Sequence, residues 1–574
     1  MEGILHPNPQ FARAGIVLLN GEWEFEKGID RRRLAGRLGG KIRVPFCIES
    51  TLSGIGNREF CTECTYAKEF VLEKKPNGER LFLHFGAVDY VAEVYCNGEH
   101  VLSHEGGYTP FAAEITDVVR EGGNWITVYV RDDTRKNIPI GKQSSRPGSY
   151  GCFYTRVTGI WQSVWLERTP REYIKSVRFN PDALRGTVSV ALEVDGKAHA
   201  EAEVTIGYDG RTVGFAAVSA GEPASIALQE RHLWEVGKGR LYDVTIRYGQ
   251  DEVKSYFGLR SVGYEGKKFL LNGKSVFQRL VLDQGYYPQG IYTAADEREL
   301  KRDIELSMAL GFNGARLHQK VFDPYFLYLC DRAGYMVWGE FASWGIQNET
   351  LEAKDTFLRQ WSEVIARDAN HPCIVTWCPM NEAWTNEESG AARDIRLVEA
   401  VYALTKRLDG TRPCVDVSGG YHSYETDIVD FHCYDPYDKL KERIEKMERG
   451  EIDFLNVYLA GEGPAYAGEP LNLSEFGGIA YRSKEEAEPR EEGEAWGYDS
   501  IGDEESFLGN YERTAELLLK SPSLSGFCYT QLYDVEQEQN GLYTYARKAK
   551  FSERGMERIR KANAMRAAIE EEEK

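Results

Sequence analysis

The sequence has no long apolar run: no stretch of roughly 18 residues is free enough of charge to cross a membrane. The amino terminus also has no basic flank followed by an apolar core, the pattern of a secretion signal. Basic residues are fewer than acidic ones, 70 Lys and Arg against 90 Asp and Glu, and the net charge of −20 repels polyanions. We therefore expect a soluble, cytoplasmic protein that binds neither membranes nor nucleic acid.

Closely spaced cysteines and clustered histidines are scarce. The chain has 11 cysteines, an odd number, and only Cys61 and Cys64 lie close together. A disulfide framework is therefore not expected, and reduced, buried thiols are the simpler interpretation. The 10 histidines form no H-E-x-x-H motif or comparable spacing, which argues against a metallohydrolase.

What the sequence does have is the composition of a folded, multidomain protein. Hydrophobic residues make up 42% and charged residues 28% of its 574 residues, which excludes disorder, collagen and coiled coil as the dominant state. At roughly 100–200 residues per domain, this length predicts about three to five domains.

The first half of the chain is predicted to form two β-sandwiches. Residues 1–170 contain short β-type runs separated by turn residues, with Asn97-Gly98 typical of a hairpin, and indicate a sandwich of the jelly-roll type. Residues 171–262 form a shorter β series that turns at Asp209-Gly210. Its length suits an immunoglobulin-like sandwich.

From residue 263 to residue 574, strand-like runs alternate with helical patterns, such as Leu300, Ile304 and Met308 at i,i+4 spacing. Eight strand-like runs are found, at residues 275–283, 313–318, 335–341, 373–382, 414–420, 428–434, 471–478 and 526–534. They predict a (β/α)₈ TIM barrel with its active site at the carboxyl ends of the strands. The acidic tail, 567–574, is interpreted as a frayed, solvated helix end.

Two glutamates stand where predicted strands face each other across the barrel mouth. Glu382 ends the fourth run and Glu475 lies near the end of the seventh. Paired carboxylates suit acetal hydrolysis, because one donates a proton to the leaving oxygen while the other stabilises or attacks the developing oxocarbenium. Either glutamate alone is more simply a solvated carboxylate or a core ion-pair partner. Together, and bordered by Asn381 and Trp384, they favour catalysis.

Eight segments spread over nearly the whole chain carry a family signature. They lie at residues 19–25, 84–111, 155–167, 255–262, 311–318, 370–384, 471–478 and 530–543, and include NHPCIVTWCPMNEAW and LNLSEFGG. In this order they resemble glycoside hydrolase family 2, the β-galactosidases, β-glucuronidases and β-mannosidases. The resemblance implies a sugar-binding jelly roll, an immunoglobulin-like domain and a catalytic barrel. It also implies retention of anomeric configuration, with Glu382 as general acid/base and Glu475 as nucleophile.

Two further residues gain a role beside these glutamates. Asn381 is placed to hydrogen-bond the sugar 2-hydroxyl, and its alternative is a strand-end turn or cap. Tyr434 looks like the family tyrosine that hydrogen-bonds the nucleophile, and its alternative is a buried structural tyrosine.

Other candidates are expected around the same mouth. Arg279, Arg316 and His318 should share one face, where an arginine can hold the nucleophile or form a core ion pair. Aromatic faces stack on pyranoses and carboxylates bind hydroxyl pairs, although a single aromatic is more often core than ligand-binding. The substrate-binding candidates of these types are Asp283, Trp344, Trp384 and Tyr529.

The chain departs from the family pattern at four places. Residues 279–285 lack the His-Glu pair of the galactosidases, and Ser343 and Gly345 stand where metal-dependent members carry Glu and His. We therefore expect no required magnesium and no cofactor. The stretch 540–542 lacks the lysine of the glucuronidase Asn-x-Lys, and Thr530 stands where many relatives have tryptophan.

These features predict a retaining exo-glycosidase that acts on terminal glycosidic bonds, most like a β-galactosidase. The open alternatives are a β-glucuronidase, a β-mannosidase, an arabinofuranosidase or galactofuranosidase, a transglycosidase, and a non-catalytic carbohydrate-binding protein. The partner is a small carbohydrate, and the resemblance also implies a homo-oligomer.

Overall fold

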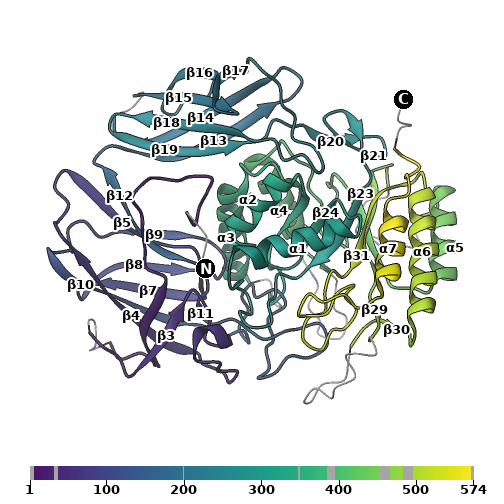
Figure 1. Ribbon diagram of the computed structural model, residues 1–574, viewed down its shortest axis with the longest axis horizontal. Coiled ribbons are helices and arrows are strands. Elements are labelled where there is room, and N and C mark those ends of the chain that lie inside the picture. The colour runs from purple at the N-terminus through teal and green to yellow at the C-terminus, as the bar shows by residue number, and fades with distance from the viewer. Residues whose placement is uncertain are drawn as a thin grey trace.

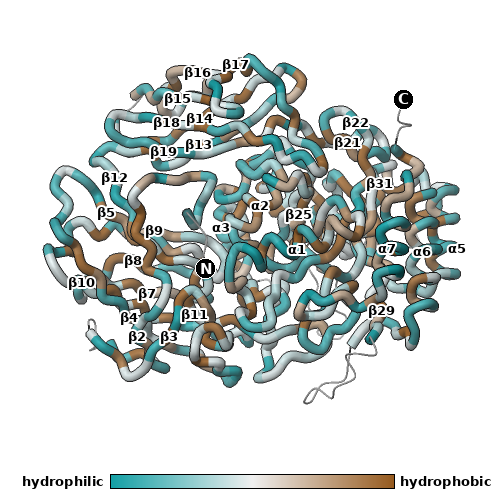
Figure 2. The backbone as a smooth tube through the Cα atoms, viewed as in Figure 1, coloured by the Kyte–Doolittle hydropathy of each residue, from teal (hydrophilic) through white to brown (hydrophobic). Residues whose placement is uncertain are grey.

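The computed structural model describes residues 6–31, 36–197, 200–346, 350–383, 395–452, 466–482 and 496–570. Two β-sandwiches lie against a barrel of strands and helices, with the second sandwich uppermost in Figure 1. The hydropathy colouring of Figure 2 alternates along the sandwich strands, as expected where one face of a sheet is buried. None of the helices in these ranges is long and apolar enough to span a membrane.

The N-terminal sandwich consists of two antiparallel sheets, ordered β3-β2-β4-β10-β7-β8 and β1-β12-β5-β9, and a short β11-β6 pair. Its elements are β1 (Val17–Leu18), β2 (Gly21–Lys27), β3 (Gly40–Val44), the 3₁₀ helix η1 (Thr51–Ser53), β4 (Glu63–Leu72), β5 (Glu79–Phe85), β6 (Val88–Asp89), β7 (Val91–Cys96), β8 (Glu99–Glu105), β9 (Phe111–Glu114), β10 (Gly122–Arg131), β11 (Gly159–Ile160) and β12 (Val164–Pro170). Asn97 and Gly98 join β7 to β8 with φ of 52° and 88°, the positive angles that a two-residue hairpin of type I′ requires.

The second sandwich pairs a sheet β13-β14-β17 with a sheet β16-β15-β18-β19. Its strands are β13 (Tyr173–Asp182), β14 (Thr187–Asp195), β15 (Glu201–Tyr208), β16 (Arg211–Ser219), β17 (Ala224–Ala227), β18 (Tyr242–Tyr248) and β19 (Asp251–Phe257). The predicted turn at Asp209-Gly210 joins β15 to β16. A small sheet of β20 (Val262–Glu265), β21 (Lys268–Leu271) and β22 (Lys274–Ser275) leads into the barrel.

The barrel is built on a parallel sheet ordered β26-β25-β24-β23-β31-β28-β27. Its strands are β23 (Gln278–Asp283), β24 (Gly314–Leu317), β25 (Met336–Glu340), β26 (Ile374–Cys378), β27 (Val429–Cys433), β28 (Leu471–Gly477) and β31 (Leu524–Thr530), and β29 (Ile479–Ala480) pairs separately with β30 (Asp499–Ser500). Every residue of β23 to β26 is buried, as is usual for parallel strands covered on both faces.

The fifth predicted strand, 414–420, is irregular. Single parallel bridges join Cys414 to Trp377 and Ser418 to Asn381, so this segment continues the sheet beyond β26. The Asp416 amide instead donates to the Thr426 hydroxyl, and the Val417 amide to the Asp416 carboxylate. Side-chain acceptors thus replace the ladder bonds of a regular strand.

The described helices are α1 (Glu297–Ala309), α2 (Pro324–Ala333), α3 (Leu351–Asp368), α4 (Ile395–Leu408), α5 (Tyr437–Glu448), α6 (Glu504–Lys520) and α7 (Glu553–Asn563). Helix α1 begins at the predicted acidic start, where the Asp296 carboxylate accepts from the Glu299 amide. In the fully described stretch 418–429 there is no helix, so the fifth β/α unit lacks its helical half. The predicted TIM barrel is otherwise confirmed.

The carboxyl-terminal tail closes the floor of the barrel, so its interpretation as a solvated end was wrong for residues 567–570. Ile569 is buried, and both carboxylate oxygens of Glu570 accept from Arg279 at 2.7 Å. Arg279 also donates to the Asn563 and Met565 carbonyls. It is the second residue of β23 and lies at the amino end of the sheet, so the prediction that it shares a face with Arg316 is wrong.

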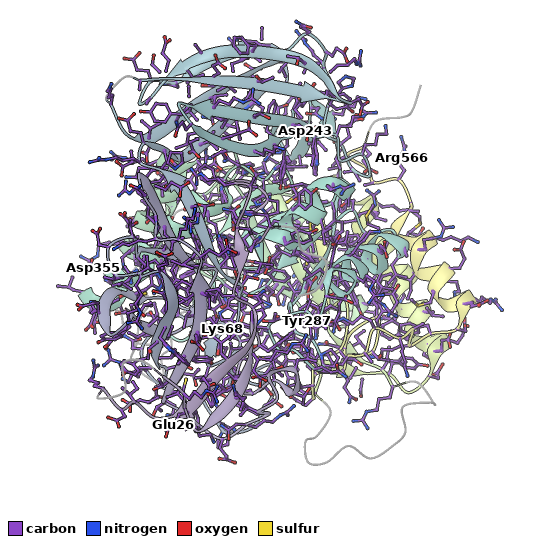
Figure 3. All side chains as sticks on the ribbon, turned by 60° about the vertical axis from the view of Figure 1, so that its left-hand side comes forward. Glu26, Lys68, Asp243, Tyr287, Asp355 and Arg566 are labelled. Carbon is purple, nitrogen blue, oxygen red and sulfur yellow. The ribbon has the colours of Figure 1, made fainter. Side chains whose placement is uncertain are left out.

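The N-terminal sandwich contributes to the core of the barrel as well as to its own. Tyr108, Tyr154 and Trp161 belong to the hydrophobic cluster of the barrel. The Tyr154 ring lies 4.9 Å from that of Tyr286, and edge-on contacts of this kind join the two units. Figure 3 labels Lys68 on this sandwich and Tyr287 in the barrel.

Candidate active site

The carboxyl ends of four barrel strands bring a cluster of polar side chains together. Glu475 lies in β28, Arg316 in β24 and His432 in β27, while Asn381 and Glu382 follow β26. Parallel strands end at the same edge of a sheet, so residues far apart in sequence meet here.

Two hydrogen-bond donors hold Glu475, and two imidazole rings lie beside it. Arg316 Nη1 lies 2.8 Å from its Oε1, and the Tyr434 hydroxyl donates to its Oε2. The Nε2 atoms of His318 and His432 each lie 3.4 Å from Oε1. The side chain is only 4% exposed, so a charged carboxylate there depends on these partners.

Glu382 has a different setting. Its backbone lies in the left-handed region at φ 48°, a conformation that costs a non-glycine residue about 1–3 kcal/mol. Its amide donates to the Ser418 carbonyl at 2.8 Å, and its Oε1 lies 2.8 Å from His432 Nδ1. The side chain is 25% exposed and therefore reaches the solvent side of the mouth.

The electrostatic environment of Glu382 and His432 is shared. Burial raises the pKa of Glu382, but the hydrogen bond from His432 and the charges of His432, Lys142 and Arg316 outweigh this and lower it. Burial lowers the pKa of His432, but Glu475 and Glu382 outweigh this and raise it. The imidazole and the Glu382 carboxylate therefore hold one proton between them.

The two glutamates are close. One carboxylate oxygen of each, together with a ring nitrogen of His432, lie within 4.8 Å of one another. Carboxyl groups about 5–5.5 Å apart characterise retaining glycosidases, whereas inverting enzymes need about 6.5–9.5 Å to admit a water. The spacing of the two glutamates therefore matches the retaining class.

Two buried polar atoms at the mouth have no hydrogen-bond partner among the described residues. They are Asn381 Nδ2 and His318 Nε2. The oxygen of Asn381 accepts from Arg316 Nη2 at 2.5 Å, which fixes the direction of the amide. Burial and the charges of Lys142 and Arg316 hold the pKa of His318 well below its usual value, so its ring is neutral. Unsatisfied polar atoms in a cavity are suited to hydrogen-bond a ligand hydroxyl.

The mouth also contains residues that the sequence analysis did not select. Glu340, at the end of β25, is fully buried and accepts from Arg316 Nε at 2.7 Å and from the Gln319 amide at 3.0 Å. It lies one residue before the end of the predicted run 335–341, so the criterion that selected Glu475 would have found it. His432 could have been found as a polar residue at the end of the sixth run.

One wall of the mouth comes from the N-terminal sandwich. The amides of Ile140 and Gly141 donate to the Trp344 carbonyl, and the Phe153 ring lies 5.3 Å from the Trp344 ring. Trp344 Nε1 donates to the Asn381 carbonyl at 3.2 Å, which places this predicted residue at the mouth.

A second clasp joins the same loop to the segment after β31. The Thr155 amide donates to Glu536 at 2.8 Å, and the Tyr154 hydroxyl donates to Glu538. A chain of hydrogen bonds then continues through buried side chains towards Glu475, in the order Asn540, Gln531, Gln284 and His318.

Two predicted residues are not brought to the carboxylates. Asp283 Oδ1 accepts from the Tyr533 hydroxyl and the Gly285 amide within the core, and burial raises its pKa to about 6. Tyr529 packs against Tyr511 of α6 and lines a cavity of about 300 Å³ behind Tyr434. Trp384 lies outside the described residues.

Within the described part of the chain, two clusters have a spacing that fits a metal ion, Glu382 with His432 and Glu475, and Asp331 with His371 and Cys373. In the second, both carboxylate oxygens of Asp331 already accept from protein groups, the Cys373 amide and the Tyr256 hydroxyl among them. In the first cluster, an ion would be coordinated by both glutamates that face the mouth.

Comparison with known proteins identifies this arrangement. Residues 42–170 match the model of the family 2 glycosyl hydrolase sugar binding domain, 172–260 the model of glycosyl hydrolases family 2, and 262–480 the model of its TIM barrel domain. A jelly roll, an immunoglobulin-like sandwich and a TIM barrel with two converging glutamates define a retaining glycoside hydrolase. The chain belongs to glycoside hydrolase family 2.

Individual relatives are similar over most of the chain. A β-glucuronidase from Rattus norvegicus is 27% identical over 551 residues, which cover 85% of this chain and 81% of that protein. A β-galactosidase from Thermoanaerobacter pseudethanolicus is 29% identical over 372 residues, covering 61% of this chain and 47% of that protein. A solved β-D-glucuronidase from Dictyoglomus thermophilum shares the fold with a TM-score of 0.76 at 21% identity, covering 97% and 98% of the two chains.

Proposed function

We propose that this glycoside hydrolase cleaves terminal β-glucuronides, with Glu475 as nucleophile and Glu382 as general acid and base. The observation that carries the mechanism is the separation of their carboxylate oxygens by no more than 4.8 Å. At that distance Glu475 is placed to attack the anomeric carbon itself, as the second carboxylate does in retaining glycosidases.

The reaction proceeds in two steps. Glu475 attacks the anomeric carbon and forms an ester while the glycosidic bond breaks, and the leaving oxygen takes a proton from Glu382. Glu382, now a carboxylate, takes a proton from a water that attacks the same carbon and frees Glu475. The greater exposure of Glu382, 25% against 4%, suits the residue that must meet the leaving group and then water.

The surrounding residues support these roles. Arg316 and Tyr434 bind the Glu475 carboxylate and orient it for attack. The Nδ2 atom of Asn381, which has no partner among the described residues, is suited to donate to the sugar 2-hydroxyl. This hydrogen bond strengthens as charge develops on the ring. Trp344 offers an aromatic face at the mouth.

The glycone is supported by relatives rather than by the barrel motifs. The expected β-galactosidase-like specificity has less support than the β-glucuronidase alternative, because the relatives are mainly β-glucuronidases. The galactosidase from Thermoanaerobacter pseudethanolicus keeps β-galactosides as the second candidate. We place the domain limits at 1–170, 171–262 and 263–574, in keeping with the ends of the family matches at 170 and 260.

The test is hydrolysis of a panel of para-nitrophenyl glycosides: β-glucuronide, β-galactoside, β-glucoside, β-mannoside, α-L-arabinofuranoside and β-galactofuranoside. We expect the β-glucuronide to react fastest, NMR to detect the β-anomer of the released sugar first, and Glu475→Ala to be inactive on every substrate. Initial release of the α-anomer would contradict the mechanism. A faster neutral glycoside would contradict the glycone assignment alone.

A further inference from the structure

We propose that Lys142, from the N-terminal sandwich, is the residue that selects an anionic glycone by pairing with the carboxylate of a uronic acid. This rests on the proposed glucuronidase activity and adds the residue that recognises the substrate. The stretch 540–542 of the barrel, where the family resemblance implies a lysine for this task, ends in the buried apolar Leu542.

Lys142 is a buried cation without an anionic partner among the described residues. It is 5% exposed, and its Nζ makes no hydrogen bond or ion pair with any of them. Its contacts are with two aromatic rings, Trp344 at 5.3 Å and Tyr154 at 5.7 Å from Nζ to the ring centroid. A buried ammonium is costly unless it is paired, so an unpaired one at a cavity is suited to an anionic ligand.

The backbone holds Lys142 in place. Gly141 has φ +61° and approaches the Gln319 carbonyl so closely that a Cβ would lie 2.1 Å from its oxygen. The Lys142 carbonyl accepts from the Tyr154 amide at 2.8 Å. The backbone at Lys142 is therefore held by the barrel on one side and by its own loop on the other, which places the side chain at the mouth before substrate arrives.

The position of Lys142 matches the glycone end of the mouth. The Trp344 ring that it contacts is hydrogen-bonded to the residue next to Glu382. The Tyr154 ring lies on its other side, and the Tyr154 hydroxyl donates to Glu538, which also accepts from Asn540. Lys142 thus approaches, from another domain, the segment in which the barrel lacks a lysine.

Charge explains why this cation is needed. Four glutamates lie around the mouth: Glu340, Glu382, Glu475 and Glu538. Their negative charges would repel the carboxylate of a uronic acid. Glu538 is already committed to Tyr154 and Asn540. Burial lowers the pKa of Lys142, but Cys152 and the nearby glutamates outweigh this and raise it, so the ammonium stays charged to meet the anion.

The experiment compares para-nitrophenyl β-D-glucuronide with para-nitrophenyl β-D-glucoside, which differ only in having a carboxylate or a hydroxymethyl group at carbon 6. The variants are Lys142→Met, which keeps the length and removes the charge, and Lys142→Arg, which keeps the charge. Lys136→Met, at an exposed lysine of the same loop, is the matched control.

We expect Lys142→Met to reduce kcat/KM for the glucuronide about 100-fold and to leave that for the glucoside within about fivefold, because only the uronate loses its counter-charge. Lys142→Arg should keep the preference for the glucuronide, and Lys136→Met should resemble the wild type. An unchanged melting temperature and retained glucoside hydrolysis show that the Met variant is folded.

Two outcomes overturn the inference. Equal losses on both substrates would mean that Lys142 only supports the glutamates, and no loss on the glucuronide would mean that it does not meet the carboxylate. If instead the wild type cleaves neutral glycosides and no glucuronide, the proposed function itself fails. If the wild type prefers another uronide and Lys142→Met loses that preference, the role of Lys142 is supported and only the identity of the sugar changes.

Discussion

Arg316 and Arg279 lie on neighbouring strands of one barrel, and both are buried, yet they serve opposite ends of it. Arg316, at the carboxyl end of β24, bonds Glu340, Glu475 and Asn381. Arg279, at the amino end of β23, bonds Glu570 and two backbone carbonyls of the closing segment. Position along the strand, rather than residue type or burial, decides whether a buried arginine belongs to the site or to the floor.

The two ends also differ in how completely their polar groups are satisfied. At the floor, every guanidinium nitrogen of Arg279 has an acceptor. At the mouth, Asn381 Nδ2 and His318 Nε2 lack partners among the described residues, Lys142 Nζ lies over two aromatic rings, and Glu382 has a strained backbone. Unsatisfied groups and strain lower stability and are retained where a ligand completes them.

The largest expected effect is at the mouth and depends on the leaving group. Glu382→Ala should reduce kcat/KM about 1,000-fold or more for an alkyl glucuronide, whose leaving oxygen needs a proton. A dinitrophenyl glucuronide needs no proton, so its first step should fall less than about tenfold, seen as a burst of dinitrophenol. Equal losses on both substrates would remove Glu382 from the role of acid.

A matched pair of substitutions then separates the two ends. Arg316→Met should lower kcat/KM about 100-fold, because Glu475 loses its charged anchor. Arg279→Met should leave kcat/KM within about twofold but lower the free energy of unfolding by about 3 kcal/mol, because Glu570 is left without its partner. Kinetics and thermal melting of the two variants side by side test this, and a large kinetic loss in Arg279→Met would break the comparison.

The smallest effect is a shift of the pH profile. The proton shared by His432 and Glu382 is needed for acid catalysis, and the raised pKa of His432 retains it to a pH above the usual histidine value of about 6.5. His432→Gln leaves the proton to Glu382 alone, so the alkaline limb of kcat/KM should move to lower pH. An unmoved alkaline limb would show that the pair does not share the catalytic proton.

The sequence predicted the fold class and family, and these are confirmed. Catalytic groups were predicted at the ends of the strands. The residues selected in this way that lie together in the structure are Glu382, Glu475, Asn381, Arg316 and Tyr434. The prediction failed at Tyr529 because side chains alternate along a strand: Thr530 faces Tyr434, whereas Tyr529 faces α6. It failed at Arg279 because a strand-like run does not show which of its residues lies at which end of the sheet.

Other features had no signal in the sequence. Lys142 lies in a loop of a different domain, and no periodicity or motif of the barrel points to it. Glu570 lies in an acidic tail whose composition is that of a solvated end, and only the position of Arg279 gives it a partner. Long-range contacts of this kind depend on how the domains dock.

The clasp between Tyr154 and Glu538 joins groups 384 residues apart. During synthesis the sandwich emerges from the ribosome first. The mouth is complete only after the segment that contains Glu538, near the end of the chain, has also been synthesised. A nascent chain that stops after Glu475 already carries both glutamates but lacks the segment that fastens the wall. Both glutamates are therefore synthesised before the segment that holds the loop of Lys142 against the mouth.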